Sequence, residues 1–311
     1  MDLLSWILII LWLVAFETIS SIDNAIINAE VLSTMKPKYQ KRFLLRGIII
    51  AVFVVRGFLP WIIMYFTAPQ LGFIGSLTAT FSWDPSTHTI IEQAAPILMM
   101  GGGIFLVFLF FHRLFLEDKH FGLRHEKFFQ SQWGRFYAVV SILLSVIVRY
   151  AMKINPMMAF SAVIGSSAFF ITHGFKNYAE QQEEKMAHGT SWISDISKIL
   201  YLEVIDATFS IDGVLGAFAF TLSVPLILLG NGLGAFLVRR LTVSNIERIK
   251  KYKYLKNWAM YSILFLGAIM MLRSFSIEIP ERVSPIITFG VIGYFFRKSK
   301  IELKTLKEII E

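Results

Sequence analysis

Long apolar runs follow one another along most of this chain, and they restrict the folds that it can adopt. Several of these runs approach or exceed the roughly 20 residues that a helix needs to cross about 30 Å of hydrocarbon. Of the 311 residues, 55% are hydrophobic and 17% are charged, whereas soluble domains carry about 25% charged residues. We therefore expect an all-α fold, a polytopic bundle of transmembrane helices surrounded by the lipid bilayer.

The runs predict about nine spans, with about seven as the lower bound because the seventh and ninth runs are short for a full crossing. The first run is no cleavable signal peptide, because it lacks a basic flank before it and a small-residue cleavage site after it. It forms either one long helix or an interrupted one. The predicted spans cover residues 3–33, 44–66, 94–113, 135–152, 155–173, 199–222, 224–241, 257–275 and 283–297.

Loop charges predict the orientation of these spans. The loops from Arg113 to Arg135 and from Arg239 to Lys256 are rich in basic residues, whereas residues 67–93 contain no Lys or Arg. Under the positive-inside rule the basic loops face the cytoplasm, so the N-terminus lies outside and the C-terminus is cytoplasmic. The same rule accounts for the net charge of +8, and we expect no nucleic-acid partner.

The spans predict two membrane halves joined by a polar segment of mixed charge. The first half covers residues 1–172 and the second covers residues 199–297. A cytoplasmic linker at residues 173–198, a helix or a loop, connects them, and residues 298–311 form a cytoplasmic tail.

Two acidic segments with one pattern stand inside the apolar sequence. The first runs from Glu17 to Asp23 and Asn24, and the second from Asp206 to Asp212 and Gly213. Each has a carboxylate, three further residues, then Ser-Ile-Asp. The predicted spans that carry them are separated by an odd offset, which makes the two copies antiparallel. We therefore expect an inverted-topology repeat, as in many transporters whose ion sites lie near the bilayer midplane.

Carboxylates at membrane depth are rare, because each costs roughly 2.5–3.5 kcal/mol on insertion scales, and they usually mark an ion or proton pathway. On a regular helix, Asp23 and Asp212 lie about 120° from the stripes that begin at Glu17 and Asp206. Asn24 and Gly213 tolerate unusual backbone angles, so we expect a local break in each helix. The stripes hold Glu17, Ser21, Asn24 and Asn28 in the first copy, and Asp206, Ser210 and Gly213 in the second, with Glu203 about 60° away.

Carboxylate, amide and hydroxyl oxygens without sulfur are the ligands of hard cations, so the pattern predicts a site for Mn²⁺, Ca²⁺ or Mg²⁺. Clustered acids also hold protons when no cation neutralises them, which permits proton–cation exchange. The metal ligands that we expect are Glu17, Asp23, Asn24, Asp206, Ser210 and Asp212. Supporting or gating residues are Ser21, Asn28, Arg56, Glu203 and Arg239. The alternative reading is that Arg56, Arg149 and Arg239 neutralise the acids as buried ion pairs.

The chain offers little for catalysis. It contains no cysteine, which excludes disulfides, thiolate catalysis and Cys-based zinc sites. Five of its six histidines lie in or beside the predicted cytoplasmic loops, without the spacing of a ligand set, and no nucleophile accompanies the membrane acids. We therefore do not expect an enzyme.

The acidic segments also carry a resemblance. Phe16-Glu17 through Asp23-Asn24-Ala25, with Glu203 through Asp212-Gly213, resembles the TerC superfamily, and more closely a bacterial TerC-like branch in which Asp-Gly replaces Asp-Ser. The resemblance spans nearly the whole chain, since it extends to Gly232 through Val243 and to the Glu-Ile-Pro280-Glu segment. It implies an inner-membrane protein linked to tellurium resistance and, in several members, to manganese export. Gly213 removes a hydroxyl that typical members offer.

These inferences together predict a divalent-cation transporter, with Mn²⁺ efflux favoured and proton coupling open. The alternative is a membrane scaffold or assembly factor that helps to metallate or insert other proteins, with the insertion machinery as its partner. A homodimer is also open.

Overall fold

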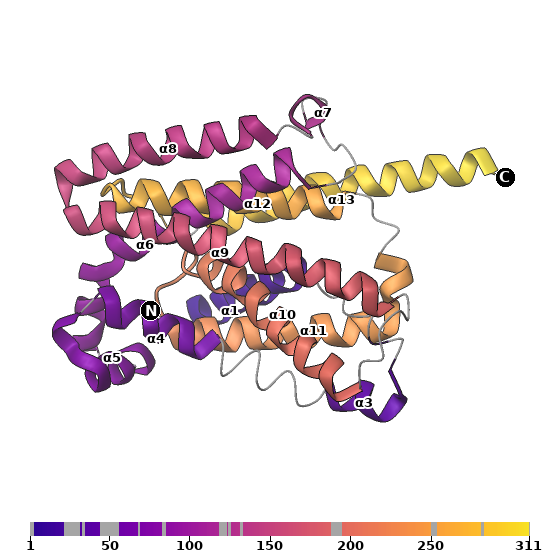
Figure 1. The fold of residues 1–311 in the computed structure, drawn as a ribbon, viewed down its shortest axis with the longest axis horizontal. Coiled ribbons are helices and arrows are strands. Elements are labelled where there is room, and N and C mark those ends of the chain that lie inside the picture. Colours follow the sequence, from indigo (N-terminus) through magenta and orange to yellow (C-terminus); the bar gives the residue numbers. More distant parts are fainter. Residues whose placement is uncertain are drawn as a thin grey trace. The chain divides into compact units, whose positions relative to one another are not determined.

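The computed structural model describes residues 3–21, 32, 35–43, 56–67, 69–82, 85–117, 123, 126–130, 133–187, 195–249, 254–280 and 283–310. These residues form helices and connecting turns, without a β-strand among them. The helices are α1 (Leu3–Ser20), α3 (Pro37–Arg42), α4 (Arg56–Thr67), η3 (Pro69–Leu71), α5 (Gly72–Phe81), α6 (Pro85–Phe115), α7 (Glu126–Phe129), α8 (Trp133–Ile154), α9 (Pro156–Ala187), α10 (Asp195–Ala217), α11 (Val224–Ile249), α12 (Leu255–Ser274) and α13 (Val283–Ile310) (Figure 1). The expected all-α class is confirmed for the described residues.

Three of the described helical segments are long and apolar enough to cross a membrane. They are Glu92–Phe115 in α6, Gly134–Ile154 in α8 and Pro156–Gly174 in α9. Shorter apolar helices cover Leu4–Ser20, Gly72–Phe81 and Val224–Val238. This composition is that of a membrane protein. The larger number of spans and the inverted repeat stay predictions.

The chain divides into two compact units. One, called the acidic unit here, comprises Met1–Ala94 and Phe170–Ser244, and the other, called the tyrosine unit, comprises Ala95–Phe169 and Asn245–Glu311. Helices α6, α9 and α11 each contribute one end to each unit. The two membrane halves expected at residues 1–172 and 199–297 stay a prediction. Residues 173–187 of the expected linker continue helix α9.

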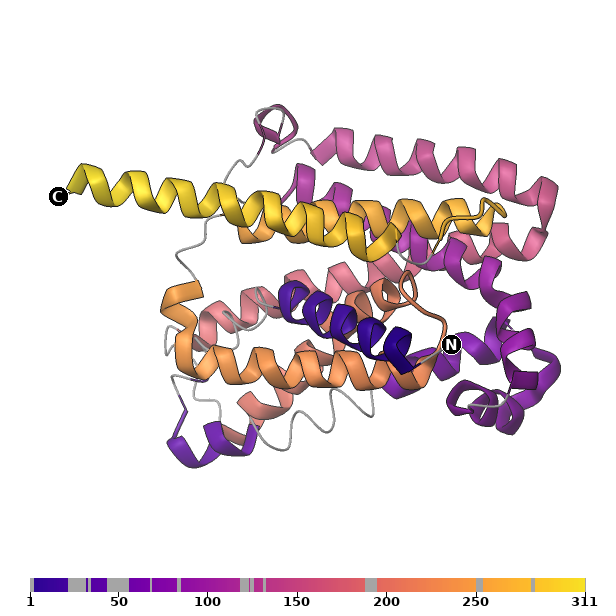
Figure 2. The same cartoon turned by 180° about the vertical axis from the view of Figure 1, so that it is seen from behind.

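In the acidic unit, α1 lies against α10 and α11, as Figures 1 and 2 both show. Glycines permit this close approach, because a side chain on any of them would overlap α1. A Cβ atom on Gly216 of α10 would meet the ring of Phe16, and one on Gly230 of α11 would meet the Cβ of Leu13. Small residues let helix backbones come together in this way in membrane proteins.

In the tyrosine unit, glycines serve the same purpose around α6. A Cβ atom on Gly165 of α9 would overlap the backbone of Gly101, and one on Gly103 would lie 3.0 Å from the carbonyl oxygen of Gly267 of α12. Ser161 adds a hydrogen bond from its hydroxyl to the carbonyl oxygen of Ile97, at 2.7 Å. Within this unit α12 runs beside α13, and the ring of Tyr261 stacks on that of Phe295 at 5.5 Å.

Candidate functional site

Glu17 stands near the end of α1, in a helix whose sequence is otherwise almost wholly apolar. Its side chain is 0% exposed. Helix α1 ends at Ser20, and Ser21 follows in a turn, with its amide bonded to the carbonyl oxygen of Glu17 at 3.1 Å. This turn keeps Ser21 on the same side of the helix as Glu17, so that the two side chains meet.

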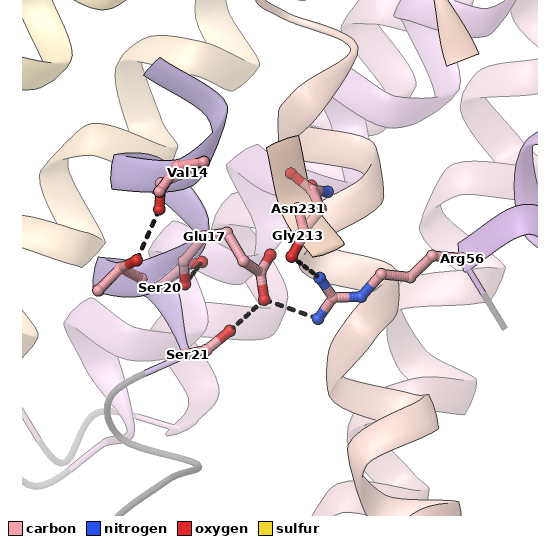
Figure 3. A network of polar contacts seen from close by, with 8 residues as sticks. Val14, Glu17, Ser20, Ser21, Arg56, Gly213 and Asn231 are labelled. Atoms are coloured by element: carbon pink, nitrogen blue, oxygen red, sulfur yellow. Dashed lines mark hydrogen bonds and ion pairs between the residues drawn. The ribbon is translucent and has the colours of Figure 1, made fainter. Parts of the chain in front are cut away.

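The Glu17 carboxylate lies at the centre of a polar cluster, which we call the Glu17 cluster (Figure 3). Its Oε1 atom accepts a hydrogen bond from the Ser21 hydroxyl at 2.6 Å and one from Nη2 of Arg56 at 2.6 Å. Arg56 opens helix α4 and is 5% exposed. Its Nη1 atom donates to the backbone carbonyl oxygen of Asn231 on α11, at 3.1 Å. The 2.6 Å bond between Arg56 and Glu17 joins two opposite charges, and short charge-assisted hydrogen bonds of this kind are the strong ones.

Helix α10 closes the cluster at Gly213. The Asn231 side chain donates from Nδ2 to the carbonyl oxygen of Gly213 at 3.3 Å. A Cβ atom on Gly213 would lie 2.6 Å from Oε2 of Glu17. On α11, a Cβ atom on Gly234 would lie 2.6 Å from the Cβ of Glu17 and 2.9 Å from the carbonyl oxygen of Val14. A side chain at residue 213 would displace the end of the Glu17 side chain, and one at residue 234 would push α11 away from α1.

Three buried polar atoms of the Glu17 cluster have no hydrogen-bond partner among the described residues. They are Oε2 of Glu17, Nε of Arg56 and the side-chain oxygen Oδ1 of Asn231. Glu17 and Asn231 are both 0% exposed. A buried polar atom without a partner costs about 1–3 kcal/mol, so the fold maintains this arrangement against a real penalty. Two of the three atoms are oxygens of the type that hard cations take as ligands.

The cluster unites several predicted residues. Glu17, Ser21 and Arg56 are in direct contact, and the buried ion pair considered for Arg56 exists at 2.6 Å. Arg149, in contrast, is an exposed residue of α8. Helix α10 carries the others of the second segment: Ser210 and Glu203 are buried, at 3% and 9% exposure, and Asp212 is partly buried.

The remaining candidates lie outside the part of the chain that the structure describes. Asp23, Asn24 and Asn28 fall in the undescribed stretch after Ser21, and the side chains of Asp206 and Arg239 are likewise undescribed, although their helices are placed. Among the described residues, no three His, Cys, Asp or Glu side chains gather as a metal-binding group. The full ligand set therefore stays a prediction.

The expected helix break at Gly213 is wrong. Helix α10 continues from Asp195 to Ala217 through Asp212 and Gly213, and the one described glycine with a positive φ is Gly72. Gly213 is needed for its missing side chain, because the Glu17 carboxylate occupies the space where a Cβ atom would lie. The expected break at Asn24 falls on undescribed residues.

Sequence reasoning missed Asn231 and Gly234 as parts of the site. Asn231 is fully buried and supplies both its backbone and its side chain to the cluster. An amide side chain inside an apolar run, three residues before a glycine, is the signal in the sequence. Its partners come from helices far away along the chain, so the spacing alone does not reveal them.

The tyrosine unit holds a second buried carboxylate. Glu126, in the short helix α7, is 0% exposed and accepts hydrogen bonds from Nδ2 of Asn257 at 2.7 Å, the Tyr261 hydroxyl at 2.9 Å and the Leu123 amide at 3.1 Å.

Nearby, burial raises the pKa of Tyr254 to about 12, assisted by a hydrogen bond to Glu302 and by the charges of Glu302 and Glu126.

These observations define a class: a helical protein with membrane-length apolar helices and an ion pair buried between four of its segments. Residues 22–305 match the family described as "Protein of unknown function (DUF475)". The chain belongs to this DUF475 family. No curated protein and no solved structure matches it.

Proposed function

We propose that this protein is an integral membrane transporter of divalent cations, with Mn²⁺ as the favoured substrate and efflux as the direction. The observation that carries the proposal is the meeting of the two acidic segments. Glu17 of the first segment lies against Gly213, the residue that directly follows Asp212 in the second. The pattern in the sequence predicts one ion site built from both segments, and their direct contact supports that prediction.

The chemistry of the cluster supports a hard cation. The Arg56 guanidinium links the Glu17 carboxylate to the carbonyl oxygen of Asn231, and the Asn231 side chain is bonded to the carbonyl oxygen of Gly213. Carboxylate and carbonyl oxygens bind Mg²⁺, Ca²⁺ and Mn²⁺ better than soft metals. The resemblance of the acidic segments to the TerC superfamily favours Mn²⁺ among these ions, and we propose the bacterial inner membrane as the location on the same ground.

Burial of the site fits transport. Three of the cluster's side chains, those of Glu17, Arg56 and Asn231, are at most 5% exposed. An acid buried this deeply in an apolar helix is expensive and, in membrane proteins, usually serves ions or protons. Proton return to the carboxylates after cation release would complete an exchange cycle, because a protonated carboxyl group no longer holds a cation.

Metal content of cells tests the proposal. The double variant Asp23→Asn with Asp212→Asn removes one acid from each segment, and we expect cells that carry it to accumulate manganese and to become sensitive to added Mn²⁺. Glu278→Gln is the matched control, because Glu278 is an exposed acid outside the acidic segments. Normal manganese content in the double variant, at normal protein levels, would reject the transport role.

A further inference from the structure

We infer that Arg56 is a tethered competitor of the transported cation: its guanidinium holds Glu17 while no metal ion is bound, and a divalent cation must displace it. This inference rests on the proposed function and names the device that regulates the same site. The first support is the contact itself, because Nη2 of Arg56 lies 2.6 Å from Oε1 of Glu17 and both side chains are buried.

The two occupants exclude one another. Glu17 carries one negative charge, and Arg56 already neutralises it. A divalent cation at that carboxylate would lie close to the guanidinium, and charges of +2 and +1 about 4 Å apart repel by about 8 kcal/mol at an effective dielectric constant of 20. Binding of a metal ion and the contact with Arg56 are therefore alternatives at Glu17.

Departure of Arg56 uncovers oxygen atoms. The guanidinium is bonded to Oε1 of Glu17 through Nη2 and to the carbonyl oxygen of Asn231 through Nη1. When it leaves, the carbonyl oxygen of Asn231 loses the guanidinium as a donor, and Oε1 of Glu17 retains the Ser21 hydroxyl. Oε2 of Glu17 has no hydrogen-bond partner among the described residues. Withdrawal of Arg56 thus makes the Glu17 carboxylate and the carbonyl oxygen of Asn231, which the guanidinium now links, accessible to a cation.

The arrangement also explains why the site can reset. An ionised Glu17 without a partner would be costly in an apolar interior, and Arg56 removes that cost whenever the cation has left. The described hydrogen bonds hold the guanidinium through its terminal nitrogens, Nη1 and Nη2. Its Nε atom has no hydrogen-bond partner among the described residues.

The size of the competition can be estimated. Minor conformations of proteins are populated at about 0.1–10%, and a ligand that binds only such a state has its apparent affinity reduced by that fraction. If Arg56 is withdrawn in about 10% of molecules, wild-type affinity is about tenfold weaker than that of the open site. Loss of the competitor should therefore tighten binding by at least this factor.

Equilibrium binding of Mn²⁺ to the purified full-length protein in detergent tests the inference, with free Mn²⁺ counted by electron paramagnetic resonance. We expect Arg56→Gln to lower the dissociation constant by at least about tenfold. Arg56→Lys keeps the positive charge but loses the two-pronged contact, and we expect an intermediate dissociation constant. Arg149→Gln, an exposed arginine of the tyrosine unit, is the matched control and should bind like wild type.

Arg56→Lys distinguishes competition by the guanidinium from a general effect of positive charge, because it keeps the charge. If Arg56→Gln does not fold, Arg56→Lys alone is used for the test. Wild-type affinity in Arg56→Lys would overturn the inference and leave the proposed function standing. Weaker binding in either Arg56 variant would overturn it as well. Absence of Mn²⁺ binding in wild type and in every variant would instead overturn the proposed function itself.

Discussion

Among the described residues, each unit has one carboxylate that is completely buried, and the two carboxylates are stabilised by different means. Glu17 in the acidic unit and Glu126 in the tyrosine unit are both 0% exposed. Glu17 is bonded through one oxygen, to a guanidinium and a hydroxyl, while its other oxygen has no partner among the described residues. Both oxygens of Glu126 are bonded, with an amide, a phenol and a backbone N–H among its donors.

This difference in hydrogen bonding distinguishes Glu17, whose partner we propose to be exchangeable, from Glu126, whose bonds we expect to serve the fold. A carboxylate with both oxygens bonded inside one unit ties the short helix α7 to α12 and offers little to a ligand. A carboxylate with an open oxygen and a flexible cationic side chain as its main partner can change partners. We therefore expect the hydrogen bonding of its oxygens, and not burial alone, to distinguish the acid of the proposed ion site.

The largest effect is expected on the free energy of unfolding when the Glu17 carboxylate is replaced by an amide. Glu17→Gln leaves the Arg56 guanidinium buried without its opposite charge, and breaking a buried ion pair in this way costs about 3–5 kcal/mol. Unfolding in mixed detergent micelles measures the loss. The double variant Glu17→Gln with Arg56→Gln should recover part of it, because no buried charge then remains. A loss below about 1 kcal/mol in the single variant, as for surface pairs, would contradict the pairing.

An intermediate effect is expected at the glycines that surround Glu17. Gly234→Ala places a Cβ atom 2.9 Å from the backbone oxygen of Val14, so the helices must move apart, at about 1–3 kcal/mol. In Gly213→Ala the new Cβ atom contacts only the end of the Glu17 side chain, which can shift more easily than a backbone atom. This variant should therefore lose less stability.

Thermal unfolding of both alanine variants in detergent gives the comparison. Gly290→Ala is the control, since a Cβ atom there has no neighbour within 4 Å. Equal losses of stability for Gly213→Ala and Gly234→Ala would show that contact with the Val14 backbone oxygen is not the reason why residue 234 is a glycine.

The smallest effect is expected at Glu126. In Glu126→Gln the new amide keeps one oxygen for Tyr261 and Leu123. Its NH₂ group can donate to Asn257 if that side chain turns over, because Oδ1 of Asn257 has no partner among the described residues. We expect a loss of less than about 1 kcal/mol. Unfolding under the same conditions as for Glu17→Gln measures it, and an equal loss in the two variants would erase the distinction between the two sites.

Much of the fold could be predicted from the sequence, because apolar runs in this chain report helices directly. The apolar run at residues 135–152 coincides with helix α8, Trp133–Ile154, and the run at 257–275 coincides with helix α12, Leu255–Ser274. Helix α5 was missed, since residues 67–93 lack basic residues and read as an outer loop. Helices α11 and α13 also run farther than hydropathy indicates, into polar sequence that can continue a helix in water.

The site was predictable where its signal is local and not where it depends on packing. A carboxylate in an apolar helix is improbable by chance, so Glu17 stands out in the sequence. Gly213 was noticed for the wrong property, its backbone freedom, because the approach of Glu17 arises only once α1 lies against α10. Glu126 lies in a basic loop segment where acids are usually solvated, and nothing local indicates that it is buried.

Flux of Mn²⁺ across liposomes that contain the purified protein tests the central claim most directly. The account predicts that wild type carries Mn²⁺ and that Glu126→Gln retains this flux. In Glu17→Gln it should fall by at least about tenfold, the equivalent of about 1.4 kcal/mol. Flux that survives unchanged in Glu17→Gln, or wild-type protein that moves no Mn²⁺, would contradict the account.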